Sequence, residues 1–150
     1  MDLDILPNLD KDGTCKNVTK FFKKDLEKIV LLSGHRMIDL RSPQIDGVSG
    51  GSGNFNNSVE NKLLNGLDAQ NIVKSVDDAI HHGIDPTSKK IIIGLFINNQ
   101  RWVDVQNVIF KEHTSFANLR RKALIAFSYS FEGWQRKNHC DSVIVLNEYK

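Results

Sequence analysis

Apolar residues recur every three or four positions along most of the 150-residue chain. This spacing is the period of one face of an amphipathic α-helix. The first such segment runs from about Thr14 to Leu32 and is expected to end at Ser33 and Gly34, because glycine commonly ends a helix. Its apolar face is made of Val18, Phe22, Leu26 and Ile29, with Phe21 beside them.

A second helical pattern begins near Asn57 and ends at Gly83. Asn57 and Glu60 fit a capping pattern at its start. Gly66 lies inside the pattern and favours a bend or a division, since glycine costs up to about 1 kcal/mol within a helix.

The next segment, KKIIIGLFI at residues 89–97, is apolar almost all round. Asp85 and Pro86 precede it and predict a helix start, because aspartate caps a helix and proline suits its first position. We therefore predict a buried central helix. A β-strand over residues 91–93 is the alternative, because isoleucine is β-branched.

Two further helices are predicted, over about Gln100–Phe110 and Thr114–Phe131. After them, SVIVLNEY at residues 142–149 predicts a short β-strand that pairs with the N-terminal LDIL segment or with a second copy of the chain. The inward-facing residues are Trp102, Val105 and Ile109 on the first helix and Phe116, Leu119, Ala123, Phe127 and Ser130 on the second.

These elements predict an all-α protein, a helical bundle with a C-terminal helix-turn-helix and a short terminal strand. Residues 1–41 form an N-terminal helical segment and residues 59–150 a helical domain, with the helix-turn-helix at about 100–131. Residues 42–58 contain four glycines and few apolar side chains. We interpret them as a flexible linker or loop, because so little apolar surface does not offset the entropy of ordering.

Composition narrows the class of protein. Hydrophobic residues make up 40% of the chain and charged residues 25%, as in a folded domain. The only cysteines are Cys15 and Cys140, too few for a disulfide framework, which favours a reduced cytoplasm. No apolar run approaches the roughly 20 residues of a membrane span. The acidic N-terminus, MDLDILPNLD, is unlike a signal peptide. We expect a cytoplasmic protein without a membrane partner.

The net charge is only +2, but its distribution is uneven. Residues 14–36 carry six basic and two acidic side chains, and residues 101–137 carry seven basic and three acidic ones. Residues 37–82, between them, have three basic and six acidic side chains. One face that meets phosphate and another that does not would account for this pattern.

The last two helices carry the candidate chemistry. In a helix-turn-helix the second helix buries one face and offers the other to the DNA major groove. On a helical wheel Asn118 and Arg121 lie opposite the buried stripe, and they can bond adenine and guanine respectively. Arg120 lies nearer the core edge, in place for a phosphate or an acidic partner. The remaining candidates on the exposed face or its flank are Thr114, Ser115 and Lys122, with Lys111 in the turn.

Other sites find less support in the sequence. A basic, solvated face on a helical bundle is the simplest alternative for the run Arg120–Lys122. The histidines and cysteines match no zinc spacing, so we expect no metal and no cofactor. No nucleophile triad, phosphate loop or paired carboxylates stand out, so we expect no enzyme.

The chain resembles the ArpU-like phage transcriptional regulators, whose C-terminal part is similar to region 4 of sigma-70-type factors. The order and spacing of several segments carry this resemblance over most of the chain. They are ILPNLD at residues 5–10, NVTKFF at 17–22, RSPQIDGV at 41–48, LDAQNIVKSVDDAI at 67–80 and the stretch from Trp102 to the KALIAF sequence that ends at Phe127.

The resemblance implies a regulator that binds double-stranded DNA at promoters and activates late genes of a phage or prophage in a bacterial host. Host RNA polymerase is an implied partner. A homodimer or repeated sites are expected because one such module reads few base pairs. The implied base readers are His113, Thr114, Ser115, Asn118 and Arg121, and the implied phosphate contacts are Lys111, Arg120 and Lys122.

Two positions depart from the family pattern, which has a small residue in the turn and then a Ser or Thr cap. Here Phe110 and Glu112 stand at these positions, so we expect Thr114 to cap the second helix and delay its start. Two other functions stay open: an interaction module that contacts RNA polymerase without reading DNA, and a packaging-site DNA binder similar to small terminase subunits.

Overall fold

The computed structural model describes residues 7–43, 66–109 and 112–150, with the backbone alone for His113 and Thr114. Within these ranges the protein is all-α, as predicted, and contains no β-strand. The helical elements are α1 (Lys11–Lys20), the π-turn η1 (Phe21–Asp25), α2 (Leu26–Ser33), the 3-10 turn η2 (Met37–Arg41), α3 (Gly66–His82), α4 (Pro86–Ile92), the π-turn η5 (Ile93–Ile97), α5 (Trp102–Ile109) and α6 (His113–Lys137).

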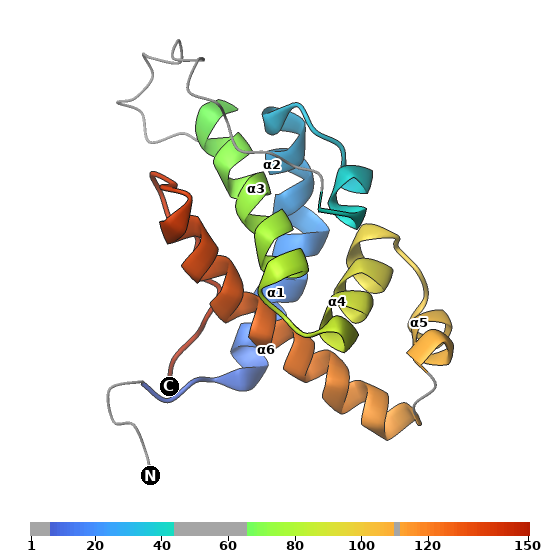
Figure 1. Cartoon of the computed structure of the whole chain (residues 1–150). Helices are drawn as coiled ribbons and strands as arrows, with labels where there is room; N and C mark the ends of the chain where they lie inside the picture. The colour runs from blue at the N-terminus through green and yellow to red at the C-terminus, as the bar shows by residue number, and fades with distance from the viewer. Residues whose placement is uncertain (1–6, 44–65, 110–111) are drawn as a thin grey trace.

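The longest helix, α6, runs across one side of the bundle, and other helices pack against it (Figure 1). It contacts α1, α3 and α4, and α2 packs along α3. The N-terminal half of α6 extends past the bundle toward α5. α5 packs mainly on α4 and η5. The bundle therefore holds the middle of α6 and leaves one side of its N-terminal half uncovered.

The first predicted helix is interrupted by a π-turn, which the sequence pattern did not predict. Asp10 caps α1, accepting from the Gly13 amide at 3.0 Å, so the helix begins three residues before Thr14. The π-turn adds a residue to one turn of helix. As a result Phe21 and its neighbour Phe22 are both buried, although consecutive residues of an α-helix point about 100° apart.

The segment over residues 89–97 is helical, and the strand alternative is wrong. Asp85 caps α4 as predicted, because its carboxylate accepts from the Ser88 amide at 3.2 Å and Pro86 takes the first helical position. The helix continues into the π-turn η5, where the ring of Phe96 stacks on Phe22 at a centroid distance of 4.7 Å. Two π-turns thus meet through one stacked pair of rings.

One hydrophobic core joins the N-terminal segment to the C-terminal helices. Phe21 contacts Phe127 and Phe131 of α6, with ring centroids 6.4 and 5.0 Å away. Val18, Leu26 and Leu40 are completely buried in the same core. Such burial is the main source of stability, roughly 1.5–3 kcal/mol for each large apolar side chain.

Two expectations about the ends of elements are wrong. Thr114 does not delay α6: the helix begins at His113, with Glu112 at the capping position in extended backbone geometry. Glu112 makes no side-chain capping bond, but its carbonyl accepts from the Phe116 amide at 2.8 Å. The helix runs past Phe131 to Lys137, because Phe131 and Gln135 both have buried faces to pack.

The predicted C-terminal strand is reduced to one antiparallel bridge between Leu9 and Tyr149. The Asp10 amide donates to the Glu148 carbonyl at 2.7 Å, and the Lys150 amide donates to the Asn8 carbonyl at 2.9 Å. The LDIL segment proposed as its partner lies outside the described residues. The same holds for the linker from residue 44 onward and for the helix start at Asn57.

Candidate nucleic-acid interface

The N-terminal half of α6 has two chemically distinct sides. Phe116, Ala123 and Leu124 are completely buried on one side. A shallow hollow of about 390 Å³ lies on the other and extends onto α1. Among the described side chains in this half of α6, the exposed polar ones are Ser115, Asn118, Arg121 and Lys122. The residues that line the hollow are Lys11, Asn118, Arg121, Lys122, Ile125 and Ala126.

The structure shows the side-chain position of only one of the other predicted contact residues. Arg120 is half-buried and faces a group of lysines on α1 and η1, rather than the side that carries Asn118. Lys111 lies outside the described residues. His113 and Thr114 open α6, but their side chains are not described.

Arg121 is engaged by a residue that the sequence did not indicate. Its guanidinium lies 2.7 Å from the Asp12 carboxylate, in the first turn of α1. The side chains of Arg121 and Asp12 are 47% and 77% exposed, so water reaches both partners. Cys15, one turn along α1, lies with its Sγ 3.8 Å from the Arg121 carbonyl oxygen. The start of α1 therefore crosses α6 at Arg121.

The start of α4 also lies near the exposed side of α6. The Ser88 hydroxyl and amide hold the pKa of Asp85 below its ordinary value, and the positive charge of Lys122 adds to this effect. Lys122 therefore has the acidic cap of α4 within electrostatic range. The exposed side of α6 is thus bordered by Asp12 of α1 and Asp85 of α4, two carboxylates that oppose the approach of an anion.

α5 precedes α6 in the chain, and residues 110–111 between them lie outside the described residues. The Trp102 ring of α5 contacts α6, with its centroid 5.5 Å from that of Phe116. Trp102 was predicted to face inward, but it remains 37% exposed. Val105 is the buried anchor of α5, and a β-carbon on Gly94 would lie 2.8 Å from its Cγ2. Glycine at position 94 therefore lets α5 approach η5 closely.

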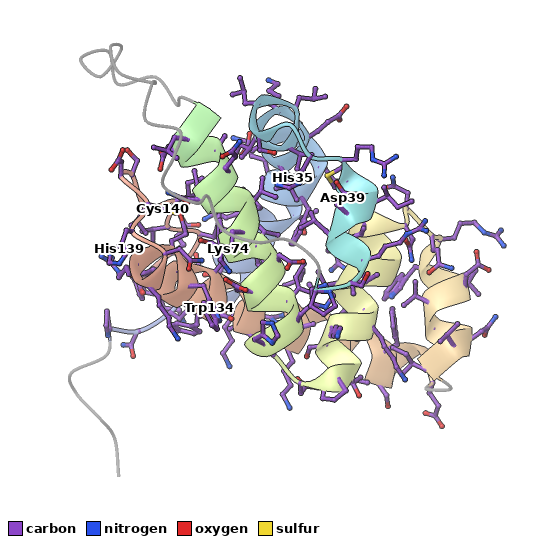
Figure 2. All side chains as sticks on the ribbon, turned by 45° about the horizontal axis from the view of Figure 1, so that its top comes forward. His35, Asp39, Lys74, Trp134, His139 and Cys140 are labelled. Atoms are coloured by element: carbon purple, nitrogen blue, oxygen red, sulfur yellow. The ribbon has the colours of Figure 1, made fainter. Side chains whose placement is uncertain are left out.

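A polar cluster joins α3 to the end of α6, and Figure 2 labels two of its members, Lys74 and Cys140. The Asp78 carboxylate accepts from Lys74 Nζ at 2.9 Å and from Asn138 Nδ2 at 3.1 Å. Cys140 Sγ lies 3.6 Å from the Ser75 hydroxyl, and burial raises the pKa of that thiol. The polar groups of this cluster are one another's hydrogen-bond partners. The cluster therefore holds the turn after α6 in place, which is a structural role.

The described residues hold neither a metal-binding cluster nor a membrane-crossing helix. No group of three His, Cys, Asp or Glu side chains there is arranged to hold a metal ion. None of the described helices is both long and apolar enough to cross a membrane.

No protein-family model, curated protein or solved structure matches the chain significantly. The geometry of α6 and its surroundings is therefore the ground for a functional proposal.

The sequence pattern did not predict that α1 contributes residues to this surface. Lys11 and Asp12 belong to the first helix, whereas Asn118 and Arg121 belong to the last. Nothing in local spacing links two segments so far apart in sequence. From the excess of basic residues, Lys16, Lys20, Lys23, Lys24 and Lys28 of the first helix were candidates to contact flanking phosphates, with a solubilising face as the favoured alternative. The sequence did not place these lysines beside α6.

Proposed function

We propose that the protein binds double-stranded DNA by placing the exposed side of the N-terminal half of α6 in the major groove. The observation that carries the proposal is the arrangement of this half-helix. Phe116 and Ala123 fix it to the core, while Asn118, Arg121 and Lys122 are exposed. An amide, a guanidinium and an ammonium on one side of a projecting helix match the donors that read base edges and phosphates.

The Asp12–Arg121 ion pair does not prevent this role. Exposed ion pairs contribute about 0.2–1 kcal/mol, because water and salt screen them. A bidentate contact between arginine and guanine contributes about 1–3 kcal/mol of discrimination. DNA can therefore displace Asp12 from Arg121 at a modest cost.

The resemblance noted above gives the proposal its biological setting. A DNA-binding regulator that activates late genes of a phage or prophage fits the basic side of α6. Such a protein acts in the host cytoplasm, contacts promoter DNA and needs no catalytic group. Activation through host RNA polymerase and binding as a homodimer belong to the same proposal.

A mobility-shift titration tests the proposal at low and physiological salt. The probes are fragments of phage DNA that span the upstream region of a late operon, a packaging region and a coding segment of equal length. Preferential retention of the upstream fragment is expected for the regulator. Retention of the packaging fragment alone indicates a packaging-site binder, and absence of any complex at 50 mM salt contradicts the proposal.

A protein-interaction module is the second candidate, and two exposed apolar residues on α5 are the observation that favours it. Val103 and Val108 are 48% and 58% exposed there. A protein partner would cover each valine separately, because five positions place them about 140° apart around the helix. Replacing both valines by Thr distinguishes the candidates, because DNA binding should persist while a complex with RNA polymerase weakens.

A further inference from the structure

A second cationic surface lies beside the first, where α1 and η1 pass the N-terminal half of α6. A hollow of about 510 Å³ opens there. Its cationic lining comes from α1 and η1 near the start of the chain and from α6 near its end. The five cations are Lys16, Lys20, Lys23, Lys24 and Arg120.

The π-turn helps to gather these lysines. Lys16 and Lys20 are four positions apart, so they share one face of α1. The π-turn that buries Phe21 and Phe22 leaves both Lys23 and Lys24 exposed. From Lys16 to Lys24 the row is about 12 Å long at 1.5 Å per residue.

Within the described parts of the chain these cations have no carboxylate partner, in contrast to three of the arginines. Arg101, Arg121 and Arg136 each lie within 3.2 Å of a carboxylate. Among residues 7–43, 66–109 and 112–150, no carboxylate lies within 4.0 Å of any cation of the hollow. Like charges one helical turn apart repel one another. A polyanion in the hollow would relieve that repulsion.

We propose that this hollow holds the phosphodiester backbone of the DNA whose major groove receives α6. The inference rests on the proposed function and adds a second contact surface to it. A 12 Å row is too long for a single phosphate group. One DNA strand presents a phosphate about every 3.4 Å along the axis, so the row matches three or four consecutive phosphates.

Neighbouring arginines connect the two surfaces. Arg121 points to the start of α1, where it meets Asp12, and Arg120 points to the lysine row. α6 thus supplies one arginine to each side of its crossing with α1. A duplex that receives α6 would have its backbone beside α1, which fixes the orientation of the protein on DNA without reading sequence.

The test compares two double variants by fluorescence anisotropy on one labelled duplex between 50 and 300 mM salt. Lys20→Gln/Lys24→Gln removes two cations of the row. Arg136→Gln/Lys137→Gln removes two exposed cations at the opposite end of α6, roughly 22 Å along the helix from Arg121. Each Lys–phosphate contact contributes about one unit to the slope of log K against log salt.

The K20Q/K24Q variant should lower that slope by about two units and weaken binding to all duplexes alike, while R136Q/K137Q binds like the parent. An unchanged slope for K20Q/K24Q overturns the inference, and if parent binding still depends on Asn118 the proposed function stands. A parent that binds no duplex at 50 mM salt overturns both. The inference is also overturned if K20Q/K24Q binds DNA like the parent and loses only binding to phosphatidylserine vesicles.

Cys15 provides a readout that needs no substitution, since it lines the same hollow and is partly exposed. Saturating duplex should slow its alkylation by iodoacetamide severalfold, measured by mass spectrometry of the Cys15 peptide. The buried Cys140 is the internal control. Equal rates at Cys15 with and without DNA would contradict occupation of the hollow.

Discussion

The Arg121 guanidinium of α6 lies 2.7 Å from the Asp12 carboxylate of α1, so one end of the chain holds an arginine that we assign to DNA recognition at the other. A carboxylate presents its oxygens to a guanidinium much as a phosphate does. Asp12 therefore occupies Arg121 in the free protein and must leave it when DNA binds.

Asp12→Asn should raise the affinity for DNA. The substitution removes an exposed ion pair of about 0.2–1 kcal/mol together with a negative charge beside the duplex. We expect binding about two to five times tighter at 100 mM salt, measured by fluorescence anisotropy. Glu132→Gln is the matched control, because it breaks the exposed pair with Arg136 near the other end of α6. Weaker binding by Asp12→Asn would contradict a competing role for Asp12.

Arg121→Ala and Lys122→Ala should have different effects on DNA binding. Loss of Arg121 should reduce discrimination at one base pair by about 1–3 kcal/mol. Loss of Lys122 should weaken binding to every sequence and lower the salt slope by about one unit. Competition titrations with matched and single-mismatch duplexes separate these outcomes. If both variants bind like the parent, this side of α6 lies outside the DNA groove.

Gly94→Ala should destabilise the protein and loosen α5. The added β-carbon would lie 2.8 Å from Val105 Cγ2, and overpacking of this kind costs about 1–3 kcal/mol. Gly133→Ala is the control, because nothing lies within 4 Å of a β-carbon there and alanine favours a helix by about 1 kcal/mol. Urea unfolding should show opposite shifts for the two variants. Equal shifts would mean that α5 does not pack closely on η5.

Acid should destabilise the fold through His81. Its side chain is fully buried, with Nε2 2.8 Å from the Leu40 carbonyl oxygen and 3.5 Å from the Asp77 carboxylate, and the effect of burial outweighs both acceptors. Burial lowers the pKa of His81 below its ordinary value of 6.5. The unfolded chain therefore holds this proton more tightly, so the free energy of unfolding is greatest above about pH 6.5 and falls as the pH drops below that value.

His81→Gln should flatten the dependence of the urea midpoint on pH between 7 and 5. His139→Asn is the control, because His139 is exposed and asparagine tolerates its positive φ of 60°. If the parent and His81→Gln lose stability in parallel as the pH falls, another group causes the acid sensitivity.

The sequence predicted most helices because their signals are local. Asp85 and Pro86 predict the start of α4, and the spacing of apolar residues from Phe116 to Phe127 predicts the buried face of α6. The π-turns were missed because adjacent apolar residues such as Phe21 and Phe22 satisfy an α-helical pattern only in part. The burial of both rings depends on Phe96 and Phe127, which tertiary packing supplies.

The candidate surface was predicted only in part, because local signals indicate which residues share a helix face but not which helices meet. Asn118 and Arg121 share one side of a single helix, so the helical wheel brings them together. Asp12 and the lysines of α1 lie near that region only because α1 packs across α6 in the folded protein. The partner of Arg121, and the hollow that contains Arg120, therefore required the tertiary structure.

The most direct test of DNA binding by α6 is photo-crosslinking from single positions along it. In a Cys15→Ser background, a cysteine-linked photo-crosslinker replaces Asn118 in one variant and Tyr129, which is exposed on the C-terminal half, in another. Our account predicts that position 118 crosslinks to bases of a bound duplex and position 129 does not. Crosslinks from position 129 alone, or from neither position on a duplex that the protein demonstrably binds, would contradict it.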